Sequence, residues 1–208
     1  MPAFRKLAFA LVATCSLCSA AESAHWVTSD DVRVTRLEEG FRIEIAMLAP
    51  VPPTTVWQVL TDFSGMASFV PNLQSSRVLA SQGNVLKIEQ RGAAHFGPFS
   101  QKFESVREIS LKPLLEVHAK QLSGTARHME SWMRLKAEDN QTRLEYRAEI
   151  VAETSLPPLI GPAFVRHEMA EQFSAMIAEM VKRYAAKAPT APTTPPASPV
   201  PPPGSKGS

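Results

Sequence analysis

Apolar and polar side chains alternate along much of this chain, first over residues 32–47 and again in several segments between residues 76 and 153. A period of two places successive side chains on opposite faces of a β-strand, so one face of each segment is expected to be buried. Turn-forming residues separate the segments, at Glu38-Glu39-Gly40, Gly83-Asn84, Gly97-Pro98, Pro113 and Asp139-Asn140. The pattern predicts a hairpin followed by an antiparallel meander with one solvated face.

Two further segments have the spacing of amphipathic helices. After Pro50–Pro53, apolar residues at intervals of three and four predict a short helix, followed by an irregular turn as far as Pro71; they are Val56, Val59, Leu60 and Phe63. A longer, methionine-rich stripe runs between about Gly161 and Ala186, through Val165, Met169, Phe173, Met176, Met180 and Tyr184. The order of elements predicts an α+β fold whose long C-terminal helix lies on the sheet.

The N-terminus has the pattern of an export signal. Arg5 and Lys6 precede an apolar run of about eleven residues, and small residues at positions 19–21 precede Glu22. The run is shorter than the ~20 residues that span a bilayer. We therefore expect a signal peptide over residues 1–21 and a periplasmic or secreted protein. Both cysteines lie within this segment, which leaves no thiol for the mature chain.

The C-terminus is rich in proline. Residues 189–208 contain eight of the 18 prolines and very few apolar side chains, so we expect an extended or disordered tail over residues 187–208. One domain, residues 22–186, remains between signal and tail. The chain has 22 basic and 20 acidic side chains, and the first 21 residues hold two of the basic ones, so the mature chain is neutral. This balance argues against nucleic acid as a partner.

Short motifs stand near both ends of the predicted domain. They are Ala49-Pro50, Val56-Trp57, Leu60-Thr61-Asp62-Phe63, Phe69 and Pro71 near the start, and residues 155–160 before Phe164-Val165-Arg166 near the end. These residues resemble the START-like, or SRPBCC, superfamily, and within it the polyketide cyclase/dehydrase and coenzyme-Q-binding START branch. The resemblance covers about Val32 to Ala186. It implies a helix-grip fold, in which a curved antiparallel sheet wraps around the C-terminal helix, with an apolar cavity for lipids, quinones, sterols or aromatic polyketides.

Polar residues interrupt the predicted inward faces of the strands, at Gln90, Gln101, Ser105, Gln121, Ser131 and Tyr146. A buried amide or hydroxyl without a partner costs about 1 to 3 kcal/mol, so six of them favour a hollow interior in which water or a ligand completes the hydrogen bonds. Solvation at strand ends, or pairing among these side chains, is the alternative. By the same alternation Tyr146 is the only titratable group inside, with Arg91, Glu130 or His128 entering only if the register slips by one residue.

The methionine stripe would form the floor of such a cavity, although a stripe of this kind is also typical of an ordinary packed core. Together with the resemblance, these positions predict a set of ligand-binding residues: Gln90, Phe99, Gln101, Phe103, Gln121, Met129, Ser131, Met133, Tyr146, Phe164, Met169, Phe173 and Met176. For Trp57 and Asp62, which belong to the motifs, structural roles are favoured, with Asp62 capping the turn after the short helix.

The sequence predicts no metal site, no cofactor and no catalytic residue. The five histidines form no metal-like pair, and the spacing of His167 and Glu171 is that of an exposed helix contact. No nucleophile triad, glycine-rich phosphate loop or nucleotide-binding motif is present. Binding is therefore favoured over catalysis.

The pattern as a whole predicts an exported protein that binds a hydrophobic small molecule, such as a lipid, an isoprenoid or quinone, or a polyketide-like compound. Transient contact with a membrane is compatible with such a role. Two alternatives stay open. One is a polyketide cyclase or dehydratase that uses acid–base residues in the same cavity, and the other is a protein-interaction module that uses the sheet face or the tail.

Overall fold

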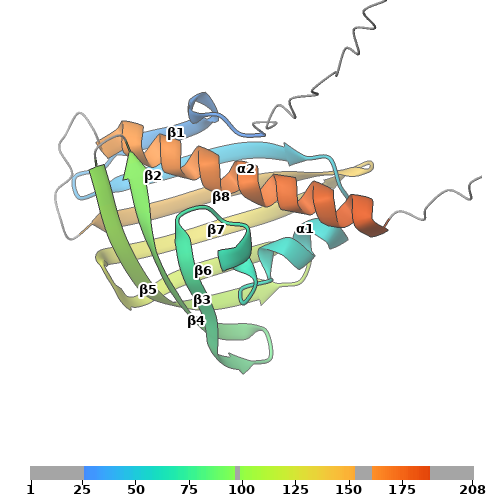
Figure 1. Cartoon of the computed structure of the whole chain (residues 1–208), viewed down its shortest axis with the longest axis horizontal. Helices are drawn as coiled ribbons and strands as arrows, with labels where there is room; N and C mark the ends of the chain where they lie inside the picture. The colour runs from blue at the N-terminus through green and yellow to red at the C-terminus, as the bar shows by residue number, and fades with distance from the viewer. Residues whose placement is uncertain (1–25, 97–98, 153–160, 188–208) are drawn as a thin grey trace, which may run out of the picture.

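The computed structural model describes residues 26–96, 99–152 and 161–187. The predicted signal peptide, the Gly97-Pro98 turn, the motif at residues 155–160 and the tail beyond Lys187 lie outside these residues. Within them, one curved sheet has the strand order β1-β2-β8-β7-β6-β5-β4-β3, and all neighbours are antiparallel (Figure 1). The strands are β1 (Val32–Arg36), β2 (Phe41–Ala49), β3 (Leu73–Gln82), β4 (Val85–Phe96), β5 (Phe99–Lys112), β6 (Glu116–Gly124), β7 (Ala126–Glu138) and β8 (Gln141–Ala152).

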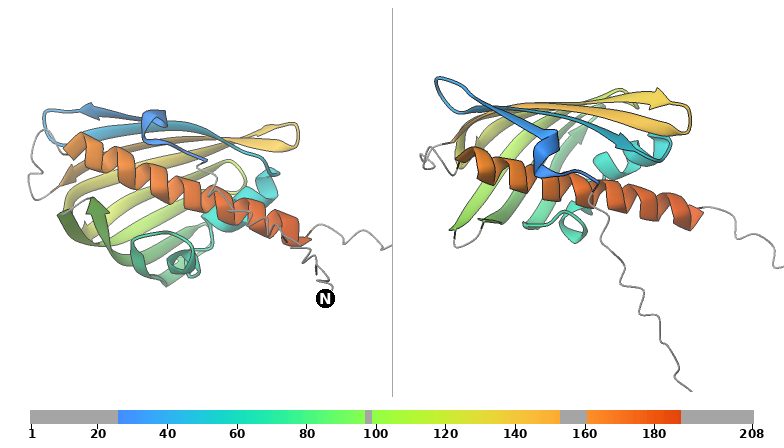
Figure 2. Two further views of the ribbon diagram at one scale, coloured as in Figure 1. Left: turned by 45° about the horizontal axis from the view of Figure 1, so that its top comes forward. Right: turned by 90° about the horizontal axis from the view of Figure 1, so that it is seen from above.

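The long helix α2 (Gly161–Lys187) crosses the concave face of this sheet (Figures 1 and 2). The short helix α1 (Pro53–Leu60) and the 3₁₀ turn η2 (Met66–Ser68) connect β2 to β3, and a further 3₁₀ turn, η1 (Ser29–Asp31), precedes β1. Proline at the first position of α1 suits a helix start, where its missing N–H would have no partner. No helix in the described ranges is both long and apolar enough to cross a membrane. The predicted α+β class, with the final helix gripped by a curved sheet, is confirmed.

Two groups of buried side chains hold the layers together. The larger group joins α2 to β1, β2, β7 and β8, with Ile43, Leu144 and Ile177 almost fully buried. The smaller group joins the α1–β3 connection to β4, β5 and β6, and includes Phe63, Ile88 and Ile109. Met176 packs against both groups. The interior is therefore packed on two sides, with α2 bridging them.

The predicted alternation of inward and outward residues holds for most strands. Ile43, Ile45 and Met47 of β2 are buried, and the residues between them are exposed. Leu115 is an exception: its alternation with Val117 and Ala119 predicts an inward side chain, but it is 63% exposed. It lies in the turn between β5 and β6, before the first residue of the strand, where the alternation does not yet apply.

A glycine in the middle of β4 allows two neighbours to come close. A Cβ atom at Gly92 would lie 2.1 Å from the backbone oxygen of Asn72 and 2.6 Å from Cζ of Phe103. The same Asn72 oxygen accepts a hydrogen bond of 2.9 Å from the backbone N–H of Ala93. Asn72 itself has φ of +65°, a left-handed conformation that Asn tolerates better than most residues. This close approach fixes the start of β3 against β4.

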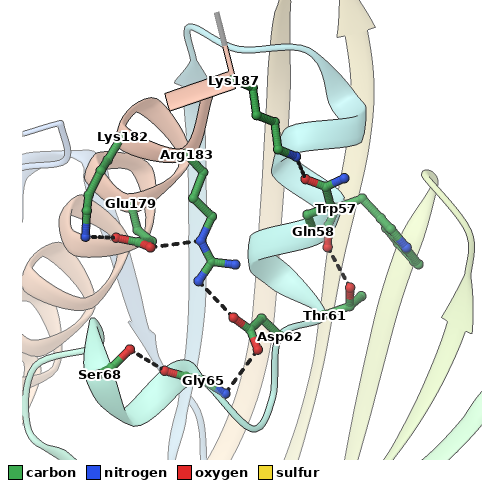
Figure 3. Close-up of polar contacts among 10 residues, drawn as sticks. All are labelled: Trp57, Gln58, Thr61, Asp62, Gly65, Ser68, Glu179, Lys182, Arg183 and Lys187. Atoms are coloured by element: carbon green, nitrogen blue, oxygen red, sulfur yellow. Dashed lines mark hydrogen bonds and ion pairs between the residues drawn. The ribbon is translucent and has the colours of Figure 1, made fainter. Parts of the chain in front are cut away.

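Asp62 joins the α1–η2 connection to the C-terminal half of α2 (Figure 3). Its Oδ1 accepts a hydrogen bond of 3.1 Å from the backbone N–H of Gly65, which confirms the predicted cap. Its Oδ2 accepts one of 2.8 Å from Nη2 of Arg183, which also pairs with Glu179 at 2.8 Å. Trp57 is partly buried against the larger group of core side chains. Both motif residues therefore have structural contacts in this fold.

Candidate ligand-binding cavity

A cavity of about 370 Å³ lies between the inner face of the sheet and α2. Strands β2 and β4 to β8 form its floor, and Phe164, Met169, Phe173 and Met176 of α2 form its roof. The end of α1, at Leu60, and the α1–β3 connection, through Phe63, Met66 and Val70, close one side. A volume of this size falls at the lower end of the roughly 300 to 1,000 Å³ that is usual for small-molecule sites. The interior is therefore hollow between its two packed groups.

A row of small side chains explains why the floor leaves space. Ala119, Ser131 and Ala148 are direct partners across β6, β7 and β8. Ala119 and Ser131 line the cavity, and all three are buried. Alanine and serine side chains are short, so Ala119 and Ser131 leave space beneath α2 that larger side chains would fill, whereas Ala148 belongs to the larger core group. Small side chains at paired positions therefore contribute to the space of the cavity.

The structure places nearly all of the predicted ligand-binding residues around this cavity. Those that line it are Gln90, Gln101, Phe103, Gln121, Met129, Ser131, Met133, Tyr146, Phe164, Met169, Phe173 and Met176. The side chain of Phe99 lies outside the described part of the chain. Met180, the next residue of the methionine stripe, is only 1% exposed and belongs to the larger core group instead. That each lining residue contacts a ligand stays a prediction.

Some of the predicted polar positions are paired with one another or with nearby protein atoms. Nε2 of Gln90 donates to Oγ of Ser76 at 3.0 Å, and Nε2 of Gln121 donates to the backbone oxygen of Ala126 at 2.5 Å. Tyr146 packs edge-on against Phe173, with ring centroids 4.8 Å apart. Burial raises the pKa of Tyr146, while the nearby charge of Arg107 and a hydrogen bond from Ser131 act in the opposite direction.

Arg107 is a cavity residue that the sequence analysis did not include. It follows Phe103 and Ser105 on β5 at the same two-residue interval, so the alternation extended by one step would have placed it inside. Its Nη2 donates to Oε1 of Gln90, but its Nε is buried and has no hydrogen-bond partner in the described residues. Burial lowers the pKa of Arg107, and Tyr146 acts against this. The prediction that Tyr146 is the only titratable group inside was therefore wrong.

Glu168 of α2 is the second missed residue. It lines the cavity, although it is only 3% exposed. Its Oε1 accepts from the backbone N–H of His95 at 3.1 Å, and its Oε2 accepts from Nδ2 of Asn72 at 3.1 Å. Burial raises the pKa of Glu168, which these two hydrogen bonds oppose. Glu168 lies four residues after Phe164, on the same side of the helix, so its position was predictable but its charge argued against burial.

The residues that a slip in register would have moved inside lie outside the cavity lining. Arg91 has an exposed side chain that pairs with Glu89 at 3.0 Å. His118 pairs with Glu130 at 2.8 Å, and its ring is stacked on Trp132 with centroids 5.1 Å apart. His128 is exposed. These groups belong to the outer face of the sheet or its edge, as the alternation predicted.

One group of side chains has the composition of a metal site. His167, Glu168 and Glu171 have ligand atoms within 4.8 Å of one another, and His167 pairs with Glu171 at 3.5 Å as its spacing predicted. The carboxylate of Glu168, however, already accepts hydrogen bonds from Asn72 and His95. A cation here would have to share oxygens that the fold uses. The absence of a metal therefore stays a prediction.

Comparison with known proteins identifies the family. A family model described as polyketide cyclase / dehydrase and lipid transport matches residues 49–181. The chain belongs to this family. A search of the curated proteins gave no match. Thus the recognised motifs and the matched region agree on one superfamily.

Several solved structures have the same fold as this family member. The Zhui aromatase/cyclase from Streptomyces sp. R1128 is 19% identical, with a TM-score of 0.59 over 70% of this chain and 97% of that one. A STAR-related lipid transfer protein from Xanthomonas axonopodis is 11% identical, with a TM-score of 0.62 over 72% and 92%. A START superfamily protein from Mycobacterium smegmatis is 9% identical, with a TM-score of 0.59 over 68% and 98%. At these identities the likeness shows the helix-grip fold.

Family and fold together indicate a START/polyketide cyclase-like protein that binds a hydrophobic small molecule. The cavity has the matching chemistry, since most of the side chains around it are apolar. Titratable side chains interrupt this apolar lining: Arg107, Tyr146 and Glu168 in its interior, and Lys102 and Glu104 where β5 is exposed.

Proposed function

We propose that this protein is exported and reversibly binds a lipid, an isoprenoid or quinone, or a polyketide-like molecule. The observation that carries the proposal is the 370 Å³ cavity between the sheet and α2, with its row of small residues on the floor. Burial of an alkyl chain in such a space is worth ~0.8 kcal/mol per CH₂, so binding needs no catalytic group. The signal-like segment with Arg5 and Lys6 supports export.

Native mass spectrometry of the protein purified from its own host tests this proposal. We expect the mass of a chain that starts at Ala21 or Glu22, together with a bound hydrophobic compound that is released on unfolding. A ligand-free protein that also fails to take up a fluorescent lipid analogue would contradict the binding role. A mass that retains Met1 would contradict export alone, so the two parts of the proposal fail separately.

A second candidate function is catalysis on a polyketide-like substrate. It is supported by Arg107, Tyr146 and Glu168, which bring three titratable side chains to one cavity. Two features weigh against it. Glu168 has hydrogen bonds to both of its oxygens, and the raised pKa of Tyr146 makes its phenolate scarce at neutral pH. Binding without turnover is therefore the preferred function.

Turnover assays with Tyr146→Phe test the catalytic candidate. General acid–base catalysis contributes about 10² to 10⁴ in rate, so an enzyme that uses this hydroxyl would lose roughly that factor in kcat. Equal binding affinities of wild type and variant would show that the cavity is unchanged. If no polyketide-like substrate is converted by the wild type, or if Tyr146→Phe converts it at the wild-type rate, this candidate is wrong.

A further inference from the structure

Arg107 brings a positive charge into a mostly apolar cavity, and no acidic side chain among the described residues pairs with it. None of the ion pairs between described residues includes its guanidinium, and the one charged or polarisable group that influences its pKa is Tyr146. The buried Nε has no hydrogen-bond partner there. Removing a charge from water costs several kcal/mol unless another charge and hydrogen bonds compensate it. The protein alone supplies only part of this compensation, through Gln90.

We propose that Arg107 binds a single carboxylate at the head of the hydrophobic ligand, so that the cargo is a fatty-acid-like monoanion. This proposal rests on the proposed function and specifies the ligand of the same cavity. A guanidinium forms directional, charge-assisted hydrogen bonds to a carboxylate, and the open Nε–H is a donor of this kind. Nearby groups extend the polar patch, since Tyr146 is close enough to interact with Arg107 and Ser131 bonds to Tyr146.

The charge balance favours a carboxylate over a phosphate. Arg107 is the one cation deep in the described part of the cavity, because the other basic residue in the lining, Lys102, is exposed near the start of β5, as is the acidic Glu104. A monoanion would neutralise Arg107, whereas a dianionic phosphate would leave one buried negative charge without a partner. Glu168, on the helix above, does not compete for the guanidinium because it bonds to Asn72 and His95.

The arrangement also predicts how the ligand is oriented. Exposure decreases along β5, from Gln101, which is exposed, through Phe103, which is partly buried, to Ile109, which is 1% exposed. Arg107 lies two residues before Ile109, at this buried end of the cavity. Apolar side chains also line the cavity beyond Arg107, among them Phe103, Met129 and Phe164, while the exposed start of β5 is polar at Gln101 and Lys102. A carboxylate on Arg107 would therefore lie at the inner end, with the alkyl chain along these side chains.

The test compares three probes of matched chain length on the full protein: dodecanoate, dodecanol and dodecyl phosphate. The affinity of each probe is measured by its displacement of the uncharged fluorophore N-phenylnaphthylamine at neutral pH, at concentrations below the critical micelle concentration of the probe. We expect wild type to bind dodecanoate at least about tenfold more tightly than dodecanol, and more tightly than the phosphate. Arg107→Met should lose the preference for the acid while still binding dodecanol. Arg107→Lys should keep part of it.

Arg91→Met is the matched control, since Arg91 lies on neighbouring β4 with an exposed side chain. It should keep the wild-type preference. Without ligand, the urea midpoint of Arg107→Met should equal or exceed that of wild type, because the variant removes a buried charge. Dodecanoate should stabilise wild type more than the variant. Equal binding of acid and alcohol by wild type, a preference that survives Arg107→Met, or tighter binding of the phosphate would overturn the carboxylate proposal. Failure of every probe and of the fluorophore to bind would overturn the proposed function itself.

Discussion

Ser131→Phe is expected to abolish uptake of a fluorescent lipid analogue, with a loss of affinity of more than about tenfold, while the protein stays folded. Ser131 lies on the cavity floor, with Ala119 and Ala148 as its cross-strand partners, and the residue is 6% exposed. A phenylalanine ring here would occupy the space of the ligand. In a packed interior such overpacking costs typically 1 to 3 kcal/mol, but in a hollow one the ring gains apolar contacts.

Fluorescence titration measures the affinity, and urea unfolding measures the stability. Two controls separate the ring from its side effects. Ser131→Ala removes the hydroxyl that bonds to Tyr146 but keeps the space, so it should bind the analogue nearly as wild type does. Ala137→Phe adds the same ring to an exposed position of β7 and should change neither property. Undiminished binding by Ser131→Phe would show that the ligand lies elsewhere. A decrease of several kcal/mol in its free energy of unfolding would show that the floor is tightly packed.

Glu168→Ala is expected to lower the free energy of unfolding by about 2 kcal/mol at neutral pH. The substitution leaves the backbone N–H of His95 and Nδ2 of Asn72 without their acceptor, and an unsatisfied polar group costs about 1 to 3 kcal/mol. The removed burial of a charge and the higher helix propensity of alanine offset part of this loss. Urea unfolding monitored by circular dichroism is the measurement.

Glu168→Gln is the matched variant, because its amide oxygen can still accept while the charge is gone. Burial raises the pKa of Glu168 above its ordinary value of 4.5, so the folded state holds this proton more tightly than the unfolded state. Its contribution to stability is complete below pH 4.5 and falls as pH rises through the folded-state pKa. Relative to wild type, Glu168→Gln should therefore become more stable over that interval. A difference that is constant with pH, or that changes in the other direction, would contradict the raised pKa.

The periodicity of the strands and of α2 predicts most of the inward-facing positions in this protein. The two-residue interval of Leu144, Tyr146, Ala148 and Ile150 predicts one inner face, and the spacing of Met169, Phe173 and Met176 predicts a helix face over it. These assignments need only the period of a strand or a helix, which is a property of the backbone. For this reason most of the cavity lining was predictable before any contact was known.

Arg107 and Glu168 show where the same reasoning stopped. Both occupy positions that the periodicity marks as inward, but a charge at such a position usually indicates solvent. Their burial depends on partners that are far away in the sequence. Gln90 lies on another strand, and Asn72 comes from the connection before β3. Nothing in the residues next to Arg107 or Glu168 in the chain indicates these contacts.

The amino-acid sequence alone determines the order of strands and helices, the face that each presents and the family motifs, because periodicity and turn chemistry are local. It does not determine the cavity. Its space includes the region over the cross-strand partners Ala119 and Ser131, and its electrostatics depend on Arg107, whose charge lacks an acidic partner among the described residues. Both arise only when residues from separate strands are brought to one floor beneath α2, since volume and charge balance are sums over neighbours in space.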